Sequence, residues 1–184
     1  MRIIIDGMGG DNAPGEIVKG VVEALNIIND EIVIVGNESA IKAELKKCRG
    51  KYPKDRLGIK HASDVITNDD APVRAIRAKK DSSMVIGITM VKNGEGDMFI
   101  SAGNSGALMA GGLFILGIDR PAIASIYPIL GRSYPSIIVD AGANAECKPN
   151  NLLEFGVMGS IYMEKVMGIK NPRVGLVNIG AEES

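Results

Sequence analysis

The chain has 184 residues, of which 46% are hydrophobic and 23% charged, and its formal net charge is −1. This composition excludes disordered and fibrous chains, and the near-neutral charge argues against nucleic acid as a partner. The longest apolar run, residues 107–118, is too short to span a membrane, and strand-like sequence begins at Met1 without a signal peptide, so we expect a cytoplasmic protein.

Short β-branched runs alternate with helical periodicity along the chain, which predicts an α/β fold with a largely parallel, doubly wound sheet in a single domain, residues 1–184. The chain stops after a strand and loop, as the N-terminal portion of a longer chain would. Segment 118–134 has little periodicity and is expected to be a lid or a short antiparallel excursion. In chain order we expect strand 2–6, helix 12–25, strand 32–35, helix 37–45, strand 57–61, helices 73–80 and 82–93, strand 97–101, helix 105–116, strand 136–140, helix 151–167 and strand 173–178.

Glycine-rich polar loops follow four of the expected strands. Ligands of open parallel sheets bind outside the carboxyl ends of the strands, where these loops would converge. Glycine lets backbone amides approach an anion, and helices starting after Gly10 and Asn104 would add their positive dipole ends. The pattern favours a phosphate ligand, although any single loop also fits a tight turn with a helix cap. The loops are residues 6–12, 101–106, 140–144 and 178–182.

Known short motifs limit the chemistry. The chain has no P-loop, and Asn12 stands where a dinucleotide fingerprint would need glycine. Residues 103–107, GNSGA, approach the nucleophile elbow G-x-S-x-G, so a serine hydrolase using Ser105 is an alternative. The only histidine, His61, precedes Ser105, against the order Ser, acid, His of that enzyme class.

Six sequence blocks occur in a fixed order: MRIIIDGMGGDNAP, APVRAIRAKKDSSM, ISAGNSGALMAGGLFI, GIDRPAIA, VDAGANAECKP and PRVGLVNIGAEES. Together they resemble the bacterial phosphate acyltransferases of phospholipid synthesis, the PlsX family of acyl-ACP:phosphate transacylases, where ACP is acyl carrier protein. The resemblance covers essentially the whole chain. Members of that family are nearly twice as long, and they usually carry a few more residues within the segment matching 112–119.

The resemblance implies a three-layer α/β/α fold, similar to phosphotransacetylases and isocitrate-type dehydrogenases, in a homodimer. It also implies that inorganic phosphate attacks the thioester of a long-chain acyl-ACP, giving acyl phosphate and free carrier. We expect no cofactor and no metal. The acyl phosphate would pass to a membrane glycerol-3-phosphate acyltransferase, and any membrane association would be peripheral.

We assign roles within the four loops from this chemistry. Phosphate is its own nucleophile, so positioning and charge stabilisation would supply most of the acceleration. The expected catalytic residues are Asn104, Ser105, Asn144 and Asn178, the first two cradling phosphate and the thioester oxyanion and the others orienting the reacting groups. Glycine amides would complete the cradle, and acidic residues would orient amides or pair with a cation. The expected substrate-binding residues are Asp6, Gly9, Gly10, Asp11, Gly103, Gly106, Asp140 and Glu182.

Acyl carrier proteins are acidic, so clusters of basic residues are candidate docking surfaces. We expect ACP to bind Arg74, Arg77, Lys79 and Lys80. A second cluster places eight basic residues between positions 42 and 60, and it fits an ordinary solvated helix face equally well. Met163 would line an acyl groove or fill a gap in the core.

Two alternatives from other functional classes remain. A phosphotransacetylase that uses coenzyme A would share the fold and the chemistry. A non-catalytic domain that senses an acyl or phosphate ligand would bind without turnover.

Overall fold

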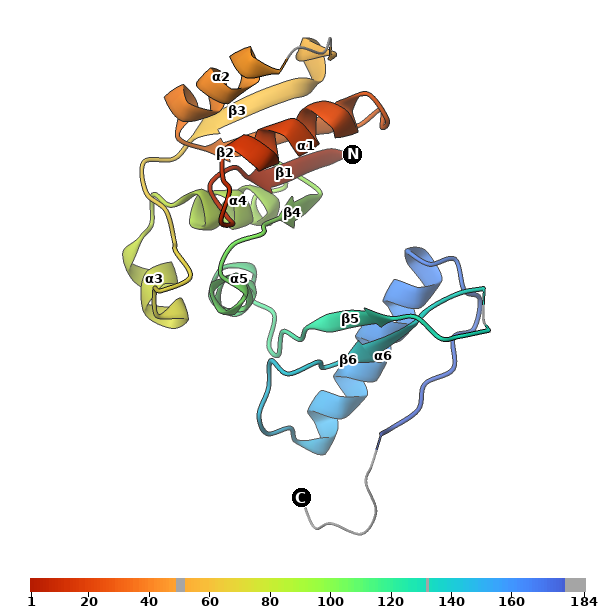
Figure 1. Cartoon of the computed structure of the whole chain (residues 1–184). Helices are drawn as coiled ribbons and strands as arrows, with labels where there is room; N and C mark the ends of the chain where they lie inside the picture. The colour runs from red at the N-terminus through yellow and green to blue at the C-terminus, as the bar shows by residue number, and fades with distance from the viewer. Residues whose placement is uncertain (49–51, 132, 178–184) are drawn as a thin grey trace. The chain divides into compact units, whose positions relative to one another are not determined.

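The computed structural model describes residues 1–48, 52–131 and 133–177 (Figure 1). The chain divides into two compact units, Met1–Pro121 and Ala122–Ser184, and each is described by itself. A single domain over residues 1–184 stays a prediction.

The first unit is built on a four-stranded parallel sheet with the strand order β3-β2-β1-β4 (Figure 1). All of β1 pairs with β2, and residues 3–5 also pair with β4 on the other side. The predicted largely parallel sheet is thus confirmed. Its strands are β1 (Arg2–Asp6), β2 (Glu31–Gly36), β3 (Leu57–His61) and β4 (Met98–Ile100).

Helices cover both faces of this sheet, which makes the fold three-layered. On one face Ile3, Ile32 and Ile34 pack with α1 (Gly15–Leu25) and α2 (Glu38–Lys47). Their neighbours along the strands point the other way, so Ile4 and Val33 form a separate cluster with Met90 of α4 (Ser83–Lys92). Strand residues are apolar on both faces because each face is covered by a helix.

Two short helices extend this unit beyond the sheet. α3 (Pro72–Ala78) and α5 (Ser105–Gly111) join α4 in a third cluster that contains Ile76, Ile88 and Ala107. α5 continues into the π-helical turn η2 (Gly112–Leu116), which ends at Gly117 in a left-handed conformation with φ of 81°. A 3₁₀ turn, η1 (Lys54–Arg56), precedes β3.

The second unit is a hairpin with one helix. β5 (Ala124–Tyr127) pairs antiparallel with β6 (Ser136–Val139), and α6 (Pro149–Lys165) contacts β6. The antiparallel excursion predicted for segment 118–134 is confirmed.

Two of the predicted strands need correction. The strand predicted at residues 136–140 forms as β6, but it pairs with β5 instead of extending the parallel sheet. The periodicity of the sequence predicts that this segment is extended, but it does not predict which strand pairs with it. Residues 173–177 are not a strand, and Asn178 lies outside the described residues. No described strand forms a hydrogen-bonded ladder with this segment. Its side chains are also poorly buried, since Val174 and Leu176 are 66% and 74% exposed.

Candidate functional site

The carboxyl ends of β1 and β4 mark the point where the direction of the sheet reverses. From β1 the chain moves outward through β2 to β3, then returns to place β4 on the opposite side of β1 (Figure 1). Loops leaving two such neighbouring strands in opposite directions open a crevice, and ligands of open α/β sheets bind there. Two of the four predicted glycine loops leave the sheet at this point.

These two loops are in close contact through glycines. A Cβ atom added to the buried Gly9 would lie 2.6 Å from Oδ2 of Asp6 and 2.9 Å from the backbone nitrogen of Gly103. One added to Gly103 would lie 3.2 Å from the Cα of Gly9. Only glycine permits this approach at position 9, since real Cβ atoms do not come so close to backbone.

Asp6 holds the two loops in place and is only 2% exposed. Its Oδ1 accepts a hydrogen bond from the Met8 amide at 3.0 Å, and its Oδ2 accepts one from the Ser101 hydroxyl at 2.8 Å. The Ser101 oxygen in turn accepts from the Gly103 amide at 3.0 Å. Asp6 therefore orients amides, one of the two roles expected for it. Ser101 was missed by the sequence analysis, although it sits in a loop that the analysis singled out.

Asn104 is also buried, and its side chain is occupied by three hydrogen bonds. Its Oδ1 accepts from the Ala107 amide at 2.9 Å and so caps α5. Its Nδ2 donates to the carbonyl oxygens of Thr67 at 3.0 Å and Asp70 at 3.1 Å. Asn104 thus ties the β4–α5 loop to the loop between β3 and α3, a contact that the sequence analysis did not foresee.

Several backbone amides of these loops have no partner in the described part of the chain. Those of Gly9, Gly10, Ser105 and Gly106 donate to no acceptor there. Gly10 has φ of 104°, which turns its backbone in a way that L side chains rarely allow. Amides that are unpaired in this part of the chain are candidate donors to an anion. Ser105 and Asp11, both exposed, lie in the same two loops.

Lys79 and Asp70 form an ion pair beside Asn104. Their Nζ and Oδ2 atoms are 2.7 Å apart, and the side chains are 28% and 26% exposed. The hydrogen bond from Lys79, followed by that from the Thr67 amide, lowers the pKa of Asp70, and the bond to Asp70 raises the pKa of Lys79. The pair therefore stabilises the fold between the two unfolded-state pKa values. This stabilisation is lost as pH falls through the lowered pKa of Asp70 or rises through the raised pKa of Lys79.

Of the other predicted ACP-binding residues, Arg74 and Arg77 lie exposed on α3, and Lys80 lies exposed just after its end. Arg77 stacks on the ring of Phe114, with its guanidinium carbon 4.6 Å from the ring centroid, and Arg74 lines a shallow groove with Val73. Lys80 donates to the Ile76 carbonyl of α3 at 3.2 Å. Phe114 is 45% exposed, so this surface combines positive charge with apolar side chains.

Asp140 and Asn144 come together in the second unit. Oδ1 of Asp140 accepts from the Ile123 amide at 2.8 Å, and its Oδ2 accepts from the amide and the Nδ2 of Asn144 at 2.7 and 3.0 Å. Burial raises the pKa of Asp140, but the hydrogen bonds from Ile123 and Asn144 lower it by more, so the net shift is downward. Asn178 and Glu182 lie outside the described residues.

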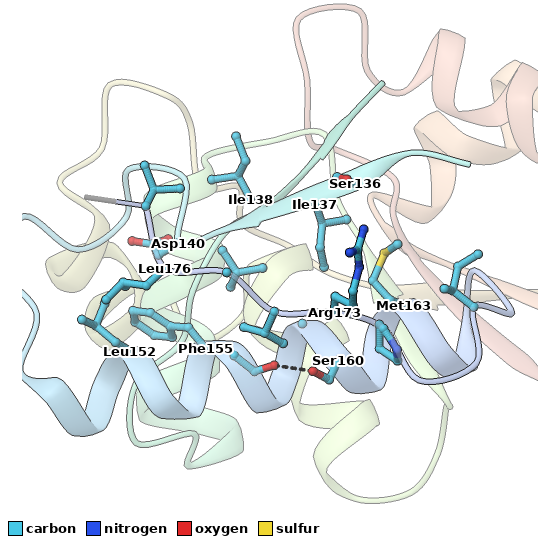
Figure 2. A pocket seen from close by; sticks show the side chains of 18 of the residues that line it. Ser136, Ile137, Ile138, Asp140, Leu152, Phe155, Ser160, Met163, Arg173 and Leu176 are labelled. Carbon is cyan, nitrogen blue, oxygen red and sulfur yellow. Dashed lines mark hydrogen bonds between the residues drawn. The ribbon is translucent and has the colours of Figure 1, made fainter. Parts of the chain in front are cut away.

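The second unit also contains a cavity of about 860 Å³ between β6, α6 and residues 169–177 (Figure 2). In Figure 2, Ile137 points from β6 toward α6, which contributes Phe155 and Met163. Asp140 and Asn144 belong to the same lining. The lining combines apolar side chains with polar and charged ones, and its apolar part could hold an aliphatic chain.

The geometry does not support a serine hydrolase. Ser105 begins α5 after β4, whereas His61 ends β3, and β2 and β1 lie between these two strands. Nδ1 of His61 accepts a hydrogen bond from the Glu38 amide at 3.4 Å. No histidine therefore stands beside Ser105 as a base.

Among the described residues, no cluster of three or more His, Cys, Asp or Glu side chains could hold a metal ion. None of the helices within those ranges is both long and apolar enough to cross a bilayer.

A parallel sheet with glycine-loop amides at its reversal point that find no acceptor among the described residues defines an α/β/α protein with a candidate anion site. The chain belongs to the family described as "Fatty acid synthesis protein", whose model matches residues 1–184. It is 57% identical to the phosphate acyltransferase of Alkaliphilus oremlandii, across the whole chain and 55% of that relative. It is 52% and 53% identical to the phosphate acyltransferases of Thermoanaerobacterium thermosaccharolyticum and Clostridium tetani, covering 54% and 55% of them. The chain thus spans about half the length of these relatives.

Proposed function

We propose that the loops after β1 and β4 bind inorganic phosphate in a phosphate acyltransferase of phospholipid synthesis. A phosphate oxygen attacks the carbonyl carbon of a long-chain acyl-ACP thioester, the C–S bond breaks, and the carrier leaves as a thiolate that takes up a proton. The observation that carries the proposal is the set of unpaired amides around the Gly9–Gly103 contact. The names of the relatives support the same chemistry.

The residues suit a reaction that needs no activated side chain. Phosphate brings its own nucleophilic oxygen, so the protein has only to position it and stabilise the charge on the thioester oxygen. The amides of Gly9, Gly10 and Gly106 supply donors, and the Ser105 hydroxyl can add one more. Asp6 holds the two loops by accepting from the Met8 amide and from the Ser101 hydroxyl. Asn104 acts by holding its loop, since its own N–H groups are engaged.

The direct test is release of the carrier thiol by the full-length protein from a long-chain acyl-ACP, with and without phosphate. We expect release that depends strictly on phosphate and survives in Ser105→Ala. Release that ignores phosphate but needs Ser105 would instead support the hydrolase. Turnover of acyl-CoA but not acyl-ACP would favour the phosphotransacetylase, and phosphate binding without turnover would favour a sensor domain.

The exposed side of α3 is the proposed docking surface for ACP. Arg74, Arg77 and Lys80 offer charge to an acidic partner, and Phe114 and Val73 offer apolar area. Lys79 is less suited to this role because Asp70 already pairs with it. The homodimer, peripheral membrane association, a cytoplasmic location and delivery of acyl phosphate to a membrane glycerol-3-phosphate acyltransferase are further parts of the proposal.

Reversing the charge of Arg77 should weaken docking without changing the chemistry. We expect Arg77→Glu to raise the KM for acyl-ACP about tenfold at low salt and less at high salt, with the KM for phosphate unchanged. Arg74→Glu, which disturbs no ring contact, should act in the same direction, and Lys92→Glu on exposed α4 surface is the matched control. If Lys46→Glu raises the KM for acyl-ACP and the Arg74 and Arg77 variants do not, the docking surface lies instead in the basic cluster at residues 42–60.

The cavity of the second unit is the proposed site of the acyl chain. Gly159 lines the cavity, and a Cβ atom there would meet Ile137 and Val139 at an ordinary 3.5 Å. A leucine at this position is therefore the chosen probe for reducing the space open to an acyl chain. We expect Gly159→Leu to raise the KM for a long-chain acyl-ACP at least tenfold, since each methylene kept from burial costs about 0.8 kcal/mol. A short-chain acyl-ACP should be unaffected, as should the exposed control Gly20→Leu.

A further inference from the structure

The loop between β3 and α3 is closed by the carboxylate of Asp70. Oδ2 of Asp70 accepts hydrogen bonds from the amide and the hydroxyl of Thr67, at 2.8 and 3.1 Å. The same oxygen accepts from Nζ of Lys79 at 2.7 Å, and Nζ also donates to the Val65 carbonyl at 2.8 Å. Lys79, at the end of α3, therefore links two points of this loop, Val65 and Asp70.

The closed loop supports the candidate phosphate site through Asn104. The carbonyls of Thr67 and Asp70 accept the two hydrogen bonds from Nδ2 of Asn104. A second contact reinforces this one, since a Cβ on Gly106 would lie only 2.8 Å from the Pro72 ring. Asn104 stands between Gly103 and Ser105, whose backbones belong to the site.

From these contacts we infer that the Asp70–Lys79 pair is a latch, and that both residues are positioning residues for phosphate binding. If the function proposed above holds, the latch fixes the β4–α5 loop in its anion-binding conformation without touching the substrate. Without Lys79, Asp70 would turn toward water, the Thr67 turn would open, and Asn104 would lose the carbonyls that hold it.

An ordinary surface ion pair would be too weak for this role, because water and salt compete with it. The Asp70–Lys79 pair differs in two respects. Both side chains are about three-quarters covered, and each makes a further hydrogen bond to the loop that it closes. Its effect on the site is therefore expected to persist at moderate salt, unlike docking of a charged partner.

The competing role for Lys79 is direct contact with ACP, as expected from the basic sequence around it. The two roles differ in what they change. A latch residue alters the KM for phosphate, whereas a docking residue alters the KM for the carrier and does so most at low salt. Neighbouring Lys80 provides the comparison, because its Nζ donates to the Ile76 carbonyl of α3 and not to this loop.

The experiment uses the full-length protein with Lys79→Met, Lys79→Arg, Asp70→Asn, Lys80→Met and the control Lys92→Met. Steady-state kinetics give both KM values at two salt concentrations, and amide hydrogen exchange follows Ala107, whose amide the Asn104 side chain caps. We expect Lys79→Met and Asp70→Asn to raise the KM for phosphate roughly 2- to 30-fold and to speed exchange at Ala107. Lys79→Arg should restore most of the phosphate affinity and most of the slow exchange at Ala107. Lys80→Met should change only the KM for the carrier.

The latch hypothesis is wrong if the rate of exchange at Ala107 is the same in Lys79→Met and Lys92→Met. It is also wrong if Lys79→Met changes only the KM for the carrier. If the Lys79→Met protein does not fold, the same measurements on Asp70→Asn decide whether the pair acts as a latch. If the unmodified protein shows no phosphate-dependent turnover, the proposed function fails, while the exchange data still decide whether the pair holds the loop.

Discussion

Gly9→Ala is expected to abolish phosphate-dependent turnover and to lower the free energy of unfolding by about 1–3 kcal/mol, the usual cost of forcing an extra carbon into a packed site. The added Cβ would fall 2.6 Å from the Asp6 carboxylate, 2.9 Å from the Gly103 nitrogen and 2.9 Å from the Ser101 hydroxyl. The Gly103 nitrogen is backbone, and Asp6 is buried and held by two hydrogen bonds, so neither can move aside cheaply. The two loops must separate instead, and the amides proposed to bind phosphate move with them.

Gly20→Ala is the matched control, because a Cβ on Gly20 in α1 would meet nothing within 4 Å. Alanine there should stabilise the helix by up to about 1 kcal/mol and leave turnover unchanged. Urea unfolding gives the stability of each variant, and titration with phosphate gives its affinity. Full phosphate affinity in a folded Gly9→Ala protein would show that the Gly9–Gly103 contact does not build the site.

The sequence predicted best those features that depend on residues close together in the chain. Apolar strands such as residues 2–6 and 32–35 predicted the parallel sheet, and the glycine loop at residues 6–12 predicted a site at the edge where β1 ends, which stays a prediction. Asn104 was identified as important, but its partners Thr67 and Asp70 lie more than thirty positions away and carry no motif. Lys79 was assigned to a docking surface because its charge is visible in sequence, whereas its pairing with Asp70 depends on how α3 folds back.

In the second unit the sequence predicted extended segments but not how they pair. The run at residues 136–140 has strand propensity, yet propensity does not say whether its partner will be parallel or antiparallel. The run at residues 173–177 is also rich in apolar residues, but no described strand pairs with it, so it lies outside the described sheets. The Asp140–Asn144 contact lies within a single turn, which is why sequence inspection grouped these two residues.

Asn104→Ala should produce the other large loss. The substitution removes the cap of α5, worth about 1 kcal/mol, and leaves the carbonyls of Thr67 and Asp70 without their donor, which costs about 1–3 kcal/mol more. The free energy of unfolding should therefore fall by roughly 2–4 kcal/mol. Because the same tether positions the Ser105 and Gly106 amides, the KM for phosphate should rise at least tenfold, an effect that kinetics at saturating acyl-ACP will measure.

Asn104→Ser separates the two contributions of this side chain. Serine is a good helix cap, so it should recover about 1 kcal/mol of stability relative to alanine, but its hydroxyl is too short to replace both bonds from Nδ2. If the tether sets phosphate affinity, the serine and alanine variants will share the same raised KM despite their different stabilities. If the serine variant regains the original KM, the cap alone orders the loop and the contacts with Thr67 and Asp70 serve only the fold.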